Sequence, residues 1–120
     1  MSTSEPASHH VGTRLLFEND RVRVWEMRLR PGESCERHVH ESDYLFVNLA
    51  HARLTLYPDG GAPESFEATP GSVEYTEVGG GVTHALTNTG DSEHYEILVE
   101  LKGPSRAATP QEPQTNEPSS

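Results

Sequence analysis

Residues 31–44 decide how the chain folds, and they read Pro31-Gly32-Glu33-Ser34-Cys35-Glu36-Arg37-His38-Val39-His40-Glu41-Ser42-Asp43-Tyr44. Side chains of an extended strand alternate between its two faces, so His38 and His40 project from the same face. A third histidine, His84, follows a run of three glycines further along the chain. We expect the fold to bring His84 to the first pair, so that the three imidazoles bind one divalent metal.

The rest of the sequence consists of short β-rich runs that are separated by Gly, Pro, Asn and Asp. No convincing helical period is present, and the turn signals recur about every eight to twelve residues. Besides the histidine stretch, the expected strands are 14–17, 21–30, 44–49, 53–57, 65–68, 72–78, 84–88 and 95–101. Many short strands of this kind are typical of a sandwich or a barrel, so the predicted fold class is all-β.

Two of these strands have informative apolar patterns. In residues 21–30 the apolar side chains change face near Trp25, and a β-bulge or a move between sheets would explain the change. The two sets are Val22 and Val24, followed by Trp25, Met27 and Leu29. In residues 95–101 the pattern keeps one phase. Its apolar members share one face, and they are Tyr95, Ile97, Val99 and Leu101.

Length and composition indicate one small domain with polar ends. The chain has 120 residues and a formal net charge of −10, which argues against nucleic acid and anionic membrane as partners. Residues 1–11 and 103–120 are predicted to be disordered tails around a domain at 12–102, because they cannot bury enough apolar surface. The sequence has no apolar run long enough for a membrane helix, and we expect no signal peptide because the first residues lack a charged start followed by an apolar stretch. A single cysteine, Cys35, cannot form an internal disulfide, so we expect a cytoplasmic protein.

Both histidine motifs resemble those of the cupin superfamily. The first is Gly32 followed by His38-x-His40, and the second is Gly81-x-x-His84-x-x-x-Asn88. The chain is most similar to small single-domain cupins that are encoded near β-alanine degradation genes, in which an Asp-Tyr pair follows the histidines. The resemblance covers about Leu15 to Lys102. It implies a cupin-type conical jelly-roll β-barrel, one transition metal per chain and a homodimer.

The chain departs from the usual cupin pattern at the fourth metal ligand. That pattern has a glutamate three or four residues after the second histidine, where this chain has Tyr44 and Leu45. On a regular strand Glu41 and Asp43 point away from the histidine face, so neither is expected to replace it. Tyr44 shares the histidine face, and we predict that it acts as the catalytic proton donor or binds a substrate carboxylate. The alternative is a tyrosine that fills the core.

Three neutral imidazoles suit several divalent metals, namely Fe, Zn, Ni, Mn, Cu and Co. They leave coordination positions open, as catalytic centres require. Some cupin dioxygenases use three histidines without the carboxylate, so the resemblance favours an Fe(II) dioxygenase that acts on a small polar metabolite. Two alternatives remain open. One is a lyase, isomerase or cyclase at the same site, and the other is a non-catalytic protein that binds a small molecule or a metal.

The remaining polar residues are weaker candidates. On a regular strand Cys35 faces away from the histidine pair, and Asn88 is interpreted as a turn residue. We interpret His51 and His94 as surface histidines, and Glu77 as a charge at the rim of the barrel. A substrate carboxylate would need a basic partner, and the candidates are Arg23, Arg28 and Arg53.

Overall fold

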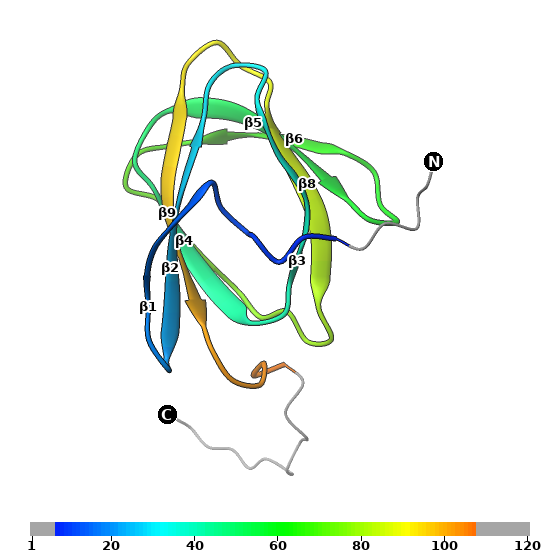
Figure 1. Cartoon of the computed structure of the whole chain (residues 1–120). Coiled ribbons are helices and arrows are strands. Elements are labelled where there is room, and N and C mark those ends of the chain that lie inside the picture. Colours follow the sequence, from blue (N-terminus) through cyan, green and yellow to red (C-terminus); the bar gives the residue numbers. More distant parts are fainter. Residues whose placement is uncertain (1–6, 108–120) are drawn as a thin grey trace, which may run out of the picture.

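The computed structural model describes residues 7–107, which form two antiparallel sheets that enclose a barrel (Figure 1). One sheet has the strand order β1-β2-β9-β4-β7, and the other has the order β3-β8-β5-β6. The strands are β1 (Arg14–Glu18), β2 (Val22–Leu29), β3 (Ser34–His40), β4 (Asp43–Asn48), β5 (Ala52–Pro58), β6 (Glu64–Ala68), β7 (Val73–Thr76), β8 (Val82–Asn88) and β9 (His94–Leu101). The predicted all-β jelly-roll fold is confirmed. Within the described residues, no helical segment has the length and apolar character that crossing a membrane requires.

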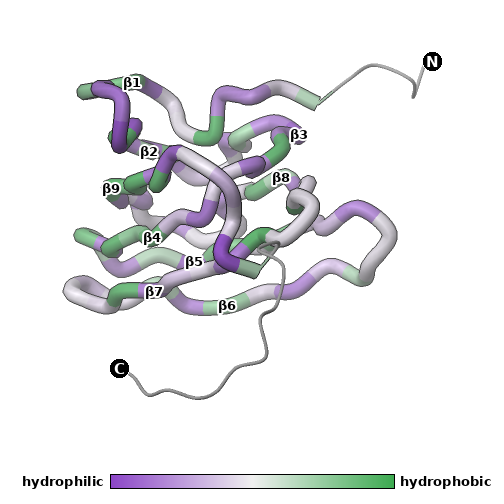
Figure 2. Tube along the Cα trace, turned by 90° about the horizontal axis from the view of Figure 1, so that it is seen from below, coloured by the Kyte–Doolittle hydropathy of each residue, from purple (hydrophilic) through white to green (hydrophobic). Residues whose placement is uncertain are grey.

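Apolar side chains between the two sheets form two clusters. One cluster consists of Met27, Leu29, Cys35, Ala52, Leu54, Ala68 and Leu86. The other consists of Val11, Trp25, Tyr44, Val78 and Leu98. Hydrophobic and hydrophilic residues alternate along the strands, as Figure 2 shows, which is the pattern of strands with one face toward the interior.

Strand β2 does not contain the bulge that its apolar pattern predicts. It pairs with β9 in an uninterrupted register, from Val22 opposite Leu101 to Leu29 opposite His94. The irregularity lies in the neighbouring strand β1, between Leu15 and Phe17. The apolar residues of β2 lie on both faces of a regular strand, because the outer face of the five-stranded sheet is apolar as well as the inner one.

That outer face carries a row of apolar side chains across all five strands. The row is built from cross-strand neighbours, and it runs Phe17, Val24, Val99, Leu45 and Tyr75. The four apolar residues of β9 share one face, as predicted, but it is this outer face. The inner face of β9 is mostly polar and consists of His94, Glu96, Leu98 and Glu100, all of which are buried.

Both ends of the domain extend into the segments that we expected to be tails. Ser8 pairs with β3, because the backbone N–H of Val39 donates to Ser8 O at 2.8 Å. Val11 is fully buried in the core. At the other end, Ser105 is buried and bonds to Asp43. Residues 7–11 and 103–107 are therefore part of the packed structure, and the remainder of both predicted tails lies outside the described residues.

Candidate metal centre

The three predicted metal ligands meet inside the barrel. His38 and His40 lie on β3 and His84 lies on β8, and His38 is the direct cross-strand neighbour of His84. One nitrogen from each ring lies within 4.8 Å of the other two, and all three side chains are buried. The predicted convergence of the three histidines is therefore confirmed, and it joins parts of the chain that are more than forty residues apart.

A β-bulge in β3 aims the histidine pair. Cys35 lies opposite Leu86, whereas His38 lies opposite His84, so β3 has one extra residue between these positions. The extra residue reverses the alternation of faces. Cys35 consequently points into the interior, with its Sγ 3.6 Å from Nδ1 of His38, and the prediction that it faces away is wrong. Burial raises the pKa of this thiol to about 12, with a smaller contribution from the charge of Glu96.

Two of the three imidazoles have the nitrogen spacing of a shared metal ion, and the third presents a free lone pair beside them. Nε2 of His40 and Nε2 of His84 lie 3.1 Å apart. Two nitrogens bound to one ion at about 2.0–2.1 Å lie roughly 2.9–3.4 Å apart when they subtend an angle between a right angle and the tetrahedral angle. Nδ1–H of His38 donates to the carbonyl of Glu36 at 2.7 Å. That bond leaves Nε2 of His38 as the nitrogen with a free lone pair, the usual outer-shell arrangement of a metal-bound histidine.

The environment keeps these imidazoles uncharged at neutral pH. Burial is the main cause that lowers the pKa of His40 to about 2, and the neighbouring His38 and His84 contribute to the same shift. Burial and the charge of His38 lower the pKa of His84 to about 4. The pKa of His38 is also lowered, chiefly by burial. Since only a neutral imidazole can ligate, the three rings are ready to bind metal at neutral pH.

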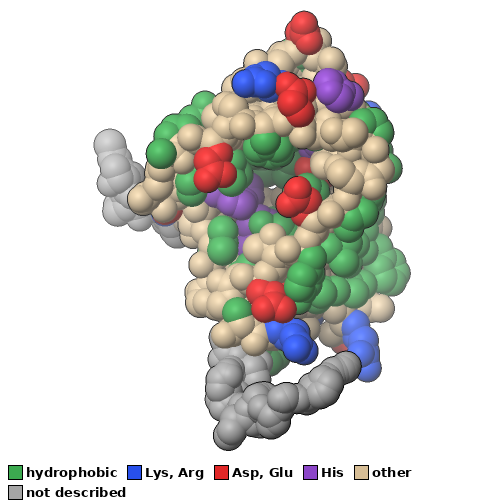
Figure 3. Space-filling view, turned by 180° about the vertical axis from the view of Figure 1, so that it is seen from behind, with side chains coloured by type: hydrophobic (Ala, Val, Ile, Leu, Met, Phe, Trp, Pro, Cys, Tyr) green, Lys and Arg blue, Asp and Glu red, His purple; other side chains and the backbone are tan. Residues whose placement is uncertain are grey.

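The histidines line a cavity of about 50 Å³ between the two sheets. Its other walls are Val11, Met27, Tyr44, Phe46, Phe66, Leu86, Glu96 and Leu98. Figure 3 shows a hollow with histidine side chains inside and acidic side chains beside its mouth. The space admits only a few atoms at a time, and most of its lining is apolar.

Tyr44 forms part of the cavity wall next to His40. Its ring stacks on the imidazole with a centroid separation of 4.0 Å and an angle of 17°. The pKa of Tyr44 is raised by burial, a hydrogen bond with Thr76 opposes that rise, and the charges of Glu96 and Glu74 add to it. The hydroxyl therefore stays protonated at neutral pH. Its position beside the candidate centre is compatible with both predicted roles, and its catalytic role stays a prediction.

Sequence reasoning missed two residues of the site, His94 and Glu96. His94 is fully buried, so its interpretation as a surface histidine is wrong. Its Nε2–H donates to Oε1 of Glu96 at 2.7 Å, and Glu96 lines the cavity. A signal was available in the final strand, where polar residues alternate with apolar ones. The apolar residues of this strand were expected to face the interior, so its polar residues were not considered as lining of the site.

The two carboxylates that follow the histidine pair point away from the centre, as predicted. Asp43 accepts hydrogen bonds from the backbone N–H of Val78 and of Arg106, at 2.9 and 2.7 Å. Burial raises the pKa of Asp43, but these two bonds and a third from Ser105 lower it by more. The pKa of Asp43 is therefore lowered overall. Glu41 is exposed and lies 3.7 Å from the ring of His9.

None of the three candidate arginines lines the histidine cavity. Arg23 bonds to Glu100 at 3.0 Å, Arg28 stacks on a tyrosine ring, and Arg53 pairs with a glutamate on β6. The other interpretations agree with the structure. His51 and Glu77 are exposed, and the Asn88 side chain accepts a bond from the N–H of Gly90 in the turn after β8.

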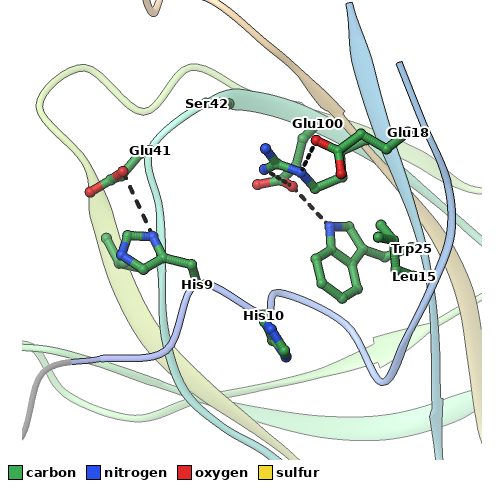
Figure 4. A pocket seen from close by; sticks show the side chains of 10 residues that line it. His9, His10, Leu15, Glu18, Trp25, Glu41, Ser42 and Glu100 are labelled. Atoms are coloured by element: carbon green, nitrogen blue, oxygen red, sulfur yellow. Dashed lines mark hydrogen bonds and ion pairs between the residues drawn. The ribbon is translucent and has the colours of Figure 1, made fainter. Parts of the chain in front are cut away.

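A second, larger cavity of about 420 Å³ lies where the N-terminal segment 7–12 crosses the barrel (Figure 4). The indole of Trp25 points toward Glu100 and donates to it at 2.8 Å, and His9 faces Glu41. Val11 lines the histidine cavity, whereas His9 and His10 line this outer one. The N-terminal segment therefore separates the two spaces.

No protein-family model matches the sequence, and no curated protein matches it. Solved structures do match. A cupin domain from Bordetella pertussis Tohama I has a TM-score of 0.68 and 27% sequence identity, over 83% of this chain and 100% of that chain. An RmlC-like cupin with a double-stranded β-helix fold from Methanocaldococcus jannaschii has a TM-score of 0.61 and 17% identity, over 83% and 93%.

A third match is a sugar phosphate isomerase of the cupin superfamily from Silicibacter pomeroyi, with a TM-score of 0.52 and 22% identity. It covers 70% of this chain and 52% of that chain. The fold is therefore shared with several cupins, and the two histidine motifs lie where the barrel brings them together. On these grounds the chain belongs to the cupin superfamily.

Proposed function

We propose that this protein is a mononuclear metal-dependent enzyme whose single divalent transition metal is held by His38, His40 and His84. The observation that carries the proposal is the convergence of three buried, neutral imidazoles on one cavity. Three protein ligands leave positions open for other molecules, which is the pattern of a catalytic rather than a structural centre. When bound, the metal supplies Lewis-acid or redox chemistry.

Within this class we favour an Fe(II) dioxygenase that acts on a small polar metabolite. Histidine is a good ligand for iron, and three protein ligands leave coordination positions open for a substrate and dioxygen. The apolar walls keep bulk water from the reacting atoms. A cavity of about 50 Å³ suits a reactant as small as dioxygen. We assign the donation of a proton to Tyr44, because its ring stacks on His40 and its hydroxyl stays protonated at neutral pH.

A lyase, isomerase or cyclase at the same centre is the second candidate. The likeness in fold to the Silicibacter pomeroyi isomerase motivates it, and Tyr44 would then move a proton beside a polarised carbonyl. A phosphorylated sugar is disfavoured as the substrate, because no Lys or Arg of residues 7–107 lines the cavity. A third candidate is a non-catalytic cupin that binds a ligand without turnover.

Oxygen uptake separates these candidates. The full-length protein, loaded with Fe(II), is offered thiols, diketones and hydroxy acids in an oxygen electrode. A dioxygenase consumes oxygen with at least one class, and His84→Ala abolishes the uptake. Substrate conversion without oxygen uptake would move the assignment to the lyase or isomerase class. Ligand-induced stabilisation with neither uptake nor conversion would leave the binding protein.

A further inference from the structure

The inner face of β9 places a buried carboxylate across the cavity from the three imidazoles. Glu96 projects from the five-stranded sheet, whereas the histidines project from the four-stranded sheet. Its side chain is buried, and apart from Tyr44 and the histidines the rest of the cavity lining is apolar. A carboxylate in such surroundings is costly to keep unless it is hydrogen-bonded or has a function.

A buried histidine holds this carboxylate by one oxygen. Nε2–H of His94 donates to Oε1 of Glu96, and both side chains are buried. The hydrogen bond described for Glu96 within residues 7–107 engages Oε1 and leaves Oε2 to the cavity. Glu96 therefore lines the cavity with one oxygen fixed and one oxygen available to a ligand.

Among residues 7–107, Glu96 is the one carboxylate that lines the cavity. The three imidazoles would have their free lone pairs on the metal. The carboxylate of Glu96 is thus the proton acceptor that the cavity lining offers.

We propose that Glu96 takes the proton of a neutral, weakly acidic ligand, such as a thiol, an enol or a hydroxy compound, that binds at the three-histidine site as its conjugate base. For a thiol, the S–H bond breaks, its proton moves to Oε2 of Glu96, and the sulfur keeps the electron pair with which it binds. No oxidant or reductant is required. This inference rests on the proposed metal centre and names the class of ligand that the centre takes.

Transfer of the ligand's proton to Glu96 leaves the total charge of the cavity unchanged, so a ligand that enters as a neutral molecule adds no net charge to it. No Lys or Arg of residues 7–107 lines the cavity, and the acidic side chains beside its mouth disfavour the approach of anions (Figure 3).

Methanethiol bound to the Co(II)-loaded, full-length protein tests this inference without any assay of activity. The thiolate-to-cobalt absorption band reports binding. Calorimetry in two buffers with different ionisation enthalpies gives the number of protons released. The wild type is expected to release no proton, because Glu96 keeps it, whereas Glu96→Gln should release one proton for each thiolate bound. Glu100→Gln is the matched control, since Glu100 is buried on the same face of β9 but lines the outer cavity, and it should behave as the wild type.

Each other outcome has a defined meaning. Equal proton release by the wild type and by Glu96→Gln, with the absorption band present in both, would overturn the role of Glu96 and leave the metal centre standing. Binding of cobalt without binding of methanethiol would overturn the ligand class. A folded protein that binds no cobalt would overturn the proposed function itself, and this inference with it.

Discussion

Acid should destabilise the metal-free protein steeply because its candidate metal ligands are buried imidazoles. In the unfolded chain a histidine binds a proton below a pKa of 6.5, whereas the folded pKa values of His84 and His40 are about 4 and about 2. Between these values the unfolded state binds more protons than the folded state does. The free energy of unfolding therefore falls as the pH drops below 6.5, and above that pH the two histidines contribute no pH dependence.

The size of the effect follows from the pKa values. At roughly pH 5 an unfolded histidine is almost fully protonated, while folded His84 and His40 remain largely neutral. At 1.36 kcal/mol per pKa unit, each of these two histidines then lowers the free energy of unfolding by about 2 kcal/mol. The sum of ~4 kcal/mol is a large part of the stability of a small domain. It corresponds to a fall in Tm on the order of 15 °C.

Urea unfolding of chelator-treated protein at about pH 7.5 and about pH 5 measures this loss. The His84→Gln variant should lose about 2 kcal/mol less than the wild type between the two pH values, because one buried titrating group is gone. The control is His51→Gln, since the side chain of His51 is 66% exposed, and it should follow the wild type. If His84→Gln keeps the full loss, buried imidazoles are not the cause and the reasoning is refuted.

Three further results are expected. Native protein should resist alkylation of Cys35 by iodoacetamide, because the thiol is buried and has a pKa of about 12, whereas unfolded protein should react. Mass spectrometry of the adduct measures the labelling, and rapid labelling of the native protein would contradict the burial of the thiol. Val11→Ala should lower the free energy of unfolding by about 1–3 kcal/mol, because a fully buried side chain is truncated; a melt identical to that of the wild type would mean that the N-terminal segment does not pack. Asp43→Asn should cost about 1–3 kcal/mol, because charge-assisted bonds to Ser105 and Arg106 weaken; faster proteolysis after residue 102 would report the release, and unchanged cleavage would refute it.

Much of the fold could be predicted because turn residues and strand alternation are local rules, and the three candidate metal ligands could be predicted because both histidine motifs resemble those of cupins. Turn residues separate the strands, and the two histidines of a His-x-His pair must project from the same face of a regular strand. His84 follows a glycine turn whose Gly81 has a φ of 124°, which presents the next strand to β3. The turns and the faces of the strands need no knowledge of distant contacts, whereas the approach of His84 to the pair on β3 was predicted from the two motifs together.

The features that could not be predicted depend on a choice between two arrangements that the local sequence allows equally well. A single extra residue in β3 turned Cys35 inward, and nothing in an alternating pattern marks a bulge. Strand β9 has an apolar face and a polar face, and the polar one faces the interior because apolar neighbours on β2 and β4 accompany the other. The burial of His94 and Glu96 follows from that choice. Val11 is a lone apolar residue in a polar stretch, so its place in the core became visible only with the fold.

The most direct measurement is the metal content of freshly purified, tag-free protein, determined by elemental mass spectrometry beside the double variant His38→Ala/His40→Ala. The three-histidine centre predicts close to one transition metal per chain in the wild type and its loss in the variant, with the fold of both checked by circular dichroism. Iron would support the dioxygenase, and zinc or nickel would support the lyase or isomerase. A folded wild type that contains no metal and takes up none from Fe(II), Co(II), Ni(II) or Zn(II) would contradict the centre.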